Sequence, residues 1–323
     1  MDCLLKLANS TLPSIDDRVL VGTPQFIFAL CSLVVNGMLL VVLVKQAKFL
    51  SFGFKAHLVS LIVASLGFNV VAVAVFVPVV LFGLLLPDVL LIVVSTPDSL
   101  FYQAIMFITT VIALERCSLF LFPKMHEMLS KQLLPVLIVA PWALALFIVT
   151  HSTLNGCYKR VDPFSLRYTY ACSIDCGLYD PILFYAAFLF PAVIFTSYVT
   201  LFAFLYFHSS KVGRAEVTRQ STQRQHVLFA VQFTIIAFLQ FCGSSFFYLL
   251  PKWFGDGHLV SSILTSISTI NSMANPICMF VFQPSIRDSF SRLGISTLFL
   301  PYIVVSTVFE RTERPSASNM HDP

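Results

Sequence analysis

Charged residues are scarce in this sequence. Lys, Arg, Asp and Glu make up 11% of the 323 residues, whereas a soluble domain carries about 25%. A soluble protein of this length needs a charged surface that so few residues cannot supply. Apolar residues make up 57% of the chain, and the mean hydropathy is +0.86. The composition therefore predicts an integral membrane protein.

Recognisable catalytic groups are also missing. The seven histidines are scattered, and none has the helical i, i+4 spacing to another His or to a Cys that would support a zinc site. There is no glycine-rich phosphate loop, and we expect no Asp–His or Glu–His pair within the membrane segments. The middles of the apolar runs hold almost no charge, which argues against ion-coupled transport. We therefore expect no enzyme, and no bound cofactor, metal ion or nucleic acid.

Seven apolar segments are present, and each is long enough to cross a membrane as a helix, which takes about 20 residues. They cover residues 24–44, 57–86, a third segment that starts between 89 and 97 and ends at 122, then 132–150, 178–207, 227–250 and 259–282. A short amphipathic helix is expected at 283–293. The sequence thus predicts an all-α seven-transmembrane helix bundle over residues 24–293, with an extracellular segment 1–23 and a cytoplasmic tail 294–323.

Basic residues are distributed unevenly between the two sides of this bundle. Fourteen of the 20 lie in the first, third and fifth loops and the tail, and the other side holds Lys6, Arg18, Lys159, Arg160, Arg167 and Lys252. Because basic loops stay in the cytoplasm, the N-terminus should lie outside. Asn9-Ser10-Thr11, a sequon for N-glycosylation, lies on that same side.

Four of the eight cysteines fall on the outer, oxidising side, namely Cys3, Cys157, Cys172 and Cys176. We favour a disulfide within one loop, from Cys157 to Cys172 or to Cys176. The alternative is that some of these thiols stay free. The remaining cysteines lie in or beside apolar segments, where Cys behaves as a small apolar residue.

One pair of charges interrupts the third apolar segment. Glu115 and Arg116 precede Phe122-Pro123 by six to seven residues, which places them at the inner membrane boundary. An ionised group deeper in hydrocarbon would cost about 2.5–3.5 kcal/mol. Arg116 could be a simple membrane anchor, but an anchor would not need an adjacent Glu. We therefore interpret the pair as functional.

The seventh segment contains a proline at Pro276. A proline within a membrane helix frees a backbone carbonyl, and neighbouring Asn side chains can bind it. Asn271 and Asn275 are four residues apart and should share one helix face.

These features, taken in order and depth, resemble the rhodopsin-like G-protein-coupled receptors. Glu115-Arg116-Cys117 is similar to the family's Asp/Glu-Arg-Tyr motif, and Asn275-Pro276-Ile277-Cys278-Met279 to its Asn-Pro-x-x-Tyr motif. Further matches are Asn36 with Gly37, Trp142 and Pro191. The resemblance covers residues 24–293.

Several positions depart from the family's pattern. Cys117 and Met279 replace two tyrosines, Ser65 stands where the family has an Asp in its second helix, and Leu91 stands where it has a disulfide cysteine. The sixth segment has no proline, and Gly243 would supply its flexibility instead. With 33 phenylalanines, the chain most resembles the nematode-type serpentine chemoreceptor families.

The resemblance implies a receptor of the plasma membrane, surrounded by lipid, that binds an extracellular small molecule or peptide and activates a heterotrimeric G protein. Glu115 would hold Arg116 in one state and release it in the other. The residues implicated in this switch and in G-protein coupling are Glu115, Arg116, Asn271, Asn275, Pro276, Arg214, Arg219 and Arg224.

Ligand-binding residues should line the outer half of the bundle. Asp98 precedes Arg116 by 18 residues, so both share one helix face about 27 Å apart, and amine receptors of the family place their anionic anchor at this depth. We favour the alternative that Thr96-Pro97-Asp98 begins the third helix, which would leave Asp98 at the outer rim. Further candidates are Phe101, Tyr102, Gln103, Gln240 and Tyr248; the last two could equally join helices to each other.

Three functions are therefore compared. The leading hypothesis is a chemosensory G-protein-coupled receptor. An amine or peptide receptor would be favoured if Asp98 proves buried and essential. A seven-helix ligand-gated channel or transporter would place the N-terminus inside, against the distribution of basic residues.

Overall fold

Helices account for most of the structure, a computed structural model that describes residues 12–46, 52–170, 176–177, 179–211, 231, 234–246, 249–250, 253–255 and 257–293. The helices are α2 (Ile15–Gln46), α3 (Phe52–Val71), the π-helix η1 (Ala72–Phe76), α4 (Val77–Leu81), α5 (Asp88–Leu121), α6 (Pro123–Gln132), α7 (Leu134–Leu154), α8 (Tyr179–Lys211), α10 (His258–Phe282) and α11 (Pro284–Arg292). A further apolar helical segment covers Thr234–Phe246. Two short strands, β1 (Arg160–Asp162) and β2 (Arg167–Thr169), lie between α7 and α8.

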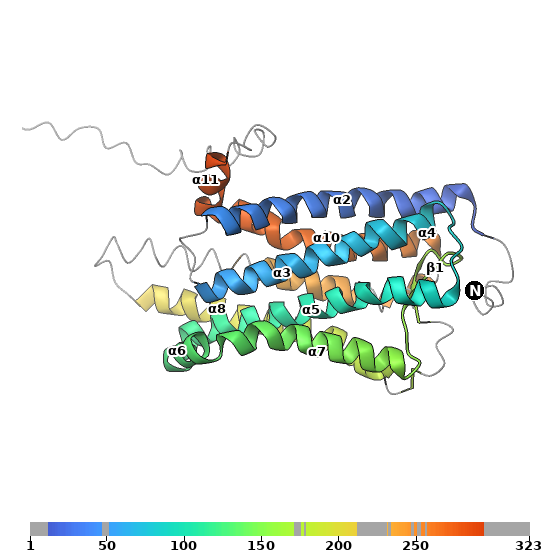
Figure 1. The fold of residues 1–323 in the computed structure, drawn as a ribbon. Coiled ribbons are helices and arrows are strands. Elements are labelled where there is room, and N and C mark those ends of the chain that lie inside the picture. The colour runs from blue at the N-terminus through green and yellow to red at the C-terminus, as the bar shows by residue number, and fades with distance from the viewer. Residues whose placement is uncertain are drawn as a thin grey trace, which may run out of the picture.

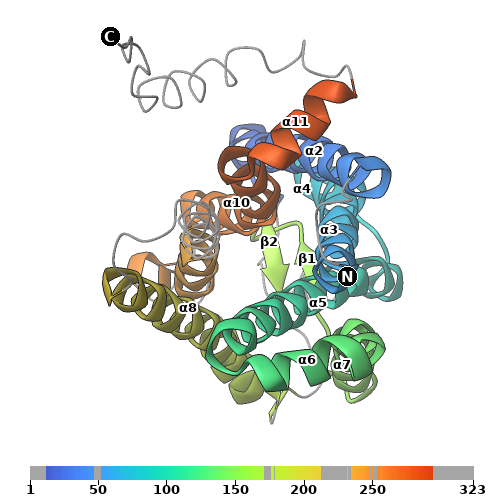
Figure 2. The same ribbon diagram turned by 90° about the vertical axis from the view of Figure 1, so that its left-hand side faces the viewer.

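The long helices lie side by side in one bundle (Figures 1 and 2). Within the described residues, five helices are long and apolar enough to cross a membrane: α2, the unit formed by α3, η1 and α4, then α5, α7 and α8. The segment Thr234–Phe246 and α10, which packs along α2, complete the seven-helix bundle. The predicted fold class is therefore confirmed.

The two ends of the bundle differ. Figure 1 places β1, α4 and the start of α5 at one end, and α6 and α11 at the other. We call these the outer end and the inner end. The helix α11 covers most of the predicted amphipathic segment, and its Ile286 and Phe290 are buried while Asp288 and Arg292 are exposed. The helix α6 lies in a loop for which the sequence indicated no helix.

The first helix begins nine residues earlier than the sequence predicts. It starts at Ile15, and Pro24 lies inside it. Ser14 caps this start, because its hydroxyl oxygen accepts a hydrogen bond from the backbone N–H of Asp17 at 3.2 Å. Asp16 and Asp17 place negative charge at the positive end of the helix dipole. These polar cap signals lie outside the apolar run, and the run by itself indicates a start at Pro24.

The third helix starts next to the early end of the predicted range of 89 to 97, and not at Thr96-Pro97-Asp98, the start that we favoured. The helix α5 begins at Asp88, directly after Pro87, and Pro97 lies inside it. Thr96 behaves as a residue of a helix interior, since its hydroxyl donates to the carbonyl of Ile92 at 2.7 Å. Thr96-Pro97-Asp98 is therefore not a helix start, and Asp98 lies about three turns inside α5.

The loop between α7 and α8 folds into a β-hairpin that enters the bundle from its outer end. β1 and β2 are antiparallel, with Val161 opposite Tyr168. Figure 2 shows the hairpin within the ring of helices. Val161 and Leu166 are fully buried and belong to one apolar cluster with Phe76 and Leu91. The hairpin thus closes the outer mouth of the bundle with its own small core.

Candidate functional site

At the inner end, Glu115 of α5 faces His57 of α3. Glu115 Oε2 lies 3.7 Å from His57 Nε2, and the two side chains are only 9% and 1% exposed. The expectation that no Glu–His pair occurs in the membrane segments is therefore wrong. The two residues lie far apart in the sequence and meet only because α3 packs along α5.

Arg116 is held by aromatic residues of two neighbouring helices. Its guanidinium carbon lies 3.8 Å from the centroid of the Phe54 ring of α3, a cation–π contact. Tyr198 of α8 is 1% exposed and interacts electrostatically with Arg116. The next residue, Cys117, donates from its thiol to the carbonyl of Ser197 in α8 at 3.2 Å. The Glu115-Arg116-Cys117 motif therefore joins α3, α5 and α8.

A polar network ties α2, α3 and α10 together in the interior. Ser272 of α10 is its centre: its hydroxyl lies 2.9 Å from that of Ser32 and accepts from the Asn69 amide at 2.9 Å. Asn36 donates to the carbonyls of Ser32 at 2.9 Å and of Ser272 at 3.2 Å. On α3, Asn69 makes the contact with α10. The Asn69 amide also donates to the backbone carbonyl of Ser65 at 2.6 Å.

The predicted residues of the seventh helix are divided between two environments. Asn275 and Pro276 are buried in α10. Asn271 instead lies against Gly243 of the segment Thr234–Phe246, where an added Cβ would come within 2.1 Å of the Asn271 amide nitrogen. Gly243 thus permits a close approach of two helices, a role that differs from the flexibility predicted for it.

At the outer end, Asp98 is buried and paired. It is 1% exposed, and its Oδ2 accepts a hydrogen bond from the Lys159 ammonium in an ion pair. A second pair joins Arg160 Nη1 to Asp88 Oδ1 at 3.2 Å. Both pairs connect α5 to the residues at the start of the hairpin. Lys159 also lies over the Tyr168 ring, 4.2 Å from its centroid.

Burial and charge together shift the pKa values of the loop residues around Asp98. Burial is the largest influence on Lys159 and opposes its charged form, but Asp98, Tyr170 and Tyr102 together outweigh burial, so the pKa of Lys159 is raised. The pKa of Tyr168 is raised strongly, first by burial and then by the charge of Asp98. Burial likewise raises the pKa of Tyr170. At neutral pH Lys159 is therefore charged and the two tyrosines are neutral.

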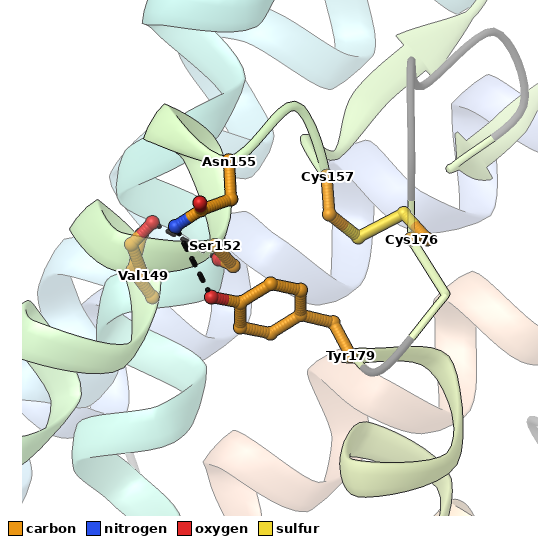
Figure 3. The surroundings of a disulfide bond; sticks show 6 residues. All are labelled: Val149, Ser152, Asn155, Cys157, Cys176 and Tyr179. Atoms are coloured by element: carbon orange, nitrogen blue, oxygen red, sulfur yellow. Dashed lines mark hydrogen bonds between the residues drawn. A yellow bond between two sulfur atoms is a disulfide. The ribbon is translucent and has the colours of Figure 1, made fainter.

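The loop that carries the hairpin is closed by a disulfide between Cys157 and Cys176 (Figure 3). Of the two predicted partners of Cys157, the structure selects Cys176. The bond joins the residues that follow α7 to those that precede α8, and the Asn155 amide donates to the Tyr179 hydroxyl nearby at 3.3 Å. It does not fasten the loop to α5, where Leu91 is buried against the hairpin. The two ion pairs make that connection instead.

A small cavity lies beneath the disulfide, between α5, α7 and the loop. Its volume is about 20 Å³, enough for about one water molecule. The lining residues are Thr96, Ser99, Gln103, Ile148, Val149, Ser152, Thr153, Cys157, Lys159 and Tyr170. Of the predicted ligand-binding residues, Gln103 is in this lining.

The other predicted ligand-binding residues serve mainly as helix contacts. Phe101 packs on Trp142, with ring centroids 6.2 Å apart, and fills the space that a Cβ on Gly67 would need. Tyr102 hydrogen-bonds to Ser244. Gln240 donates to the Thr109 hydroxyl at 3.5 Å, which joins Thr234–Phe246 to α5. Six predicted site residues lie outside the part of the chain that the structure describes, namely Asn9, Cys172, Arg214, Arg219, Arg224 and Tyr248.

Four residues that contact the predicted site were not predicted from the sequence: His57, Phe54, Tyr198 and Lys159. Their local sequence gave no signal, because each contact depends on how two segments pack. The one available signal was that His57 and Glu115 are both polar residues near the same end of neighbouring apolar segments.

Comparison with known proteins agrees with this architecture. The crystal structure of squid rhodopsin has the same fold, with a TM-score of 0.71 and 14% sequence identity over 97% of this chain and 91% of that chain. No curated protein matches the sequence. The family model "Serpentine type 7TM GPCR chemoreceptor Srx" matches residues 26–283, which extend from α2 through α10. The match covers most of the chain, and the protein, a multi-pass membrane receptor, therefore belongs to the serpentine type 7TM GPCR chemoreceptor Srx family.

Proposed function

We propose that this receptor binds an extracellular chemical signal in the outer half of the bundle and activates an intracellular G protein from the inner end. It would act in the plasma membrane, with its N-terminus outside. The observation that carries the proposal is that one helix, α5, bears residues of both sites. Asp98 contacts the hairpin at its outer end, and Glu115 and Arg116 contact α3 and α8 at its inner end.

A ligand can act through this helix by changing the balance between two packing arrangements. Only a ligand that binds one arrangement more tightly shifts the balance. At the outer end, a ligand beside Lys159 would alter how the hairpin holds α5. At the inner end, the weak cation–π contact of Arg116 with Phe54 can break at small cost, about 0.5–2 kcal/mol. Arg116 would then become available to a G protein.

The amine-receptor alternative requires a buried Asp98, and Asp98 is buried. However, Lys159 already neutralises its carboxylate. An amine would have to displace Lys159, whose side chain is only 15% exposed. The displaced lysine would then need a new partner for its charge. A peptide would need far more room than the cavity offers. The described contacts therefore favour the chemosensory function.

The experiment that tests this function compares Arg116→Ala with wild type in cells that report several second messengers during a screen of chemical ligands. We expect Arg116→Ala to lose signalling and to keep most of its surface expression. Leu114→Ala is the matched control, because Leu114 is on the same turn of α5 and is 50% exposed. Signalling by Arg116→Ala at the wild-type level would reduce Arg116 to a membrane anchor.

The proposed orientation has its own test. Glycosidase treatment should lower the apparent mass of the wild-type chain but not that of Asn9→Gln, because the sequon would be outside. Labelling of the N-terminus from the cytoplasmic side would contradict this orientation and would support the channel hypothesis.

A further inference from the structure

The lining of the outer cavity indicates what kind of molecule could bind there. Seven of its residues carry hydrogen-bonding groups: Thr96, Ser99, Gln103, Ser152, Thr153, Lys159 and Tyr170. Ile148 and Val149 are its aliphatic residues, and the carbon atoms of the polar side chains add further apolar surface. Thr96 and Ser152 already donate to backbone carbonyls of their own helices, and Lys159 donates to Asp98. An apolar ligand would offer no partner to the Gln103 amide or the Thr153 hydroxyl, which is costly in a buried site. The cavity is therefore suited to a polar ligand.

The charge of the cavity wall restricts the ligand further. Lys159 is the one charged residue in the lining, and its ammonium is already compensated by Asp98, which is not part of the lining. The pair as a whole is neutral. An ion with a single charge would have to be buried beside this neutral pair without a counterion, and burial of an uncompensated charge is strongly unfavourable.

The size of the cavity limits the ligand as well. A volume of about 20 Å³ holds about one water molecule, so a ligand must replace that volume and move nearby side chains. Lys159, the Gln103 amide and the Thr153 hydroxyl can donate hydrogen bonds to such a ligand, and the hydroxyls and Gln103 can accept them. A small molecule with both a donor and an acceptor matches these groups.

We propose that the cavity beneath the Cys157–Cys176 disulfide is the ligand site, that its ligand is a small hydrogen-bonding molecule without net charge, and that the Asp98–Lys159 pair sets this selectivity. The inference rests on the proposed receptor function, because it names the ligand class of that receptor's outer site. Asp98 and Lys159 act here as selectivity residues. Lys159 disfavours the cations that Asp98 alone would attract, and Asp98 disfavours the anions that Lys159 alone would attract.

The test uses three probes of matched size: acetamide, ethylammonium and acetate. Binding is measured as the shift in unfolding midpoint of the purified full-length receptor in detergent, so no G protein is needed. The wild type should be stabilised by acetamide alone. Lys159→Met leaves Asp98 without its cation and should shift preference toward ethylammonium. Asp98→Asn leaves Lys159 without its anion and should shift preference toward acetate, each by on the order of tenfold in affinity ratio.

The double variant Asp98→Asn with Lys159→Met is the control for folding. It has no uncompensated charge, so it should fold even where a single variant does not, and it should again prefer acetamide over both ions. A wild type that binds ethylammonium or acetate as well as acetamide, or that binds none of the probes, would overturn the inference. So would single variants whose preference for charge is unchanged.

Signalling assays run with the same probes separate this inference from the proposed function. If the probes bind with the expected charge preference but cause no second-messenger response, the receptor function is contradicted and the proposed ligand site is still supported. A response to ligands without the expected charge preference would contradict the site and leave the receptor function intact.

Discussion

His57 Nε2 and Glu115 Oε2 face each other across the α3–α5 contact at 3.7 Å, inside the inner end of the bundle. The pair gives Glu115 a partner other than the adjacent Arg116. Arg116 in turn lies over Phe54, which precedes His57 by three residues on α3. One turn of α3 therefore contacts both charges of the motif, and the switch predicted between Glu115 and Arg116 involves a second helix.

His57→Leu should lower the response to ligand. Without His57, Glu115 is left to pair with Arg116, and that pairing stabilises the state in which Arg116 is held. The measurement is basal and maximal second-messenger output at equal surface expression. In a Glu115→Gln background the same change should have little effect, because the carboxylate is gone. An equal loss in both backgrounds would mean that His57 acts through packing alone.

Gly243→Ala should destabilise the receptor by about 1–3 kcal/mol, because the added methyl would overlap the Asn271 side chain. The Cβ would lie 2.1 Å from the amide nitrogen of Asn271. Gly37→Ala is the matched control, since a Cβ there meets nothing within 4 Å. Thermal unfolding in detergent measures both. Asn271→Ala should relieve part of the loss in Gly243→Ala, and a Gly243→Ala variant as stable as Gly37→Ala would contradict the close approach.

The sequence predicted the helices and the inner motif because their signals are local. Seven apolar runs need only be counted, and Glu115 and Arg116 stand out as charges in an apolar segment. Asn275 and Pro276 stand out for the same reason. The partners of these residues could not be predicted, since the contact of His57 with Glu115 depends on the relative position of two helices along their axes.

Asp98 shows how a local signal can mislead. Threonine, proline and an acidic residue in succession favour a helix start, but the apolar residues before them extend α5 back to Asp88. Lys159 lies in a polar loop that would ordinarily be exposed, and only the folding of that loop into a buried hairpin brings it to Asp98. The site at the outer end was therefore inaccessible to reasoning from single segments.

Ser272→Ala should cost about 1–3 kcal/mol of stability, because Ser272 joins three helices and its loss leaves buried polar groups unpaired. It exchanges hydrogen bonds with Asn69 and with Ser32. Ser268→Ala is the control: among the described residues its hydroxyl bonds only to the carbonyl of Leu264 in the same helix, so about 0.5 kcal/mol or less is expected. Chemical unfolding measures the loss of stability in both variants. Equal losses would show that the hydrogen bonds of Ser272 to other helices do not stabilise the bundle.

Lys159→Met should destabilise the receptor by about 3–5 kcal/mol, because it leaves Asp98 buried without its partner. The pH dependence of this loss follows from the direction of the lysine shift. The pKa of Lys159 is raised in the folded state from its ordinary value of 10.5. Its contribution is therefore complete below that value and is lost only as pH rises through the higher folded pKa.

The difference in unfolding free energy between wild type and Lys159→Met should accordingly not shrink between neutral pH and about pH 9 and should shrink in more alkaline solution. Lys159→Arg keeps the positive charge and should recover most of the stability. Unfolding of the purified chains in detergent across this range gives the result. If the difference faded already between neutral pH and pH 9, or if Lys159→Arg were no better than Lys159→Met, the ion pair would not be what fastens the hairpin to α5.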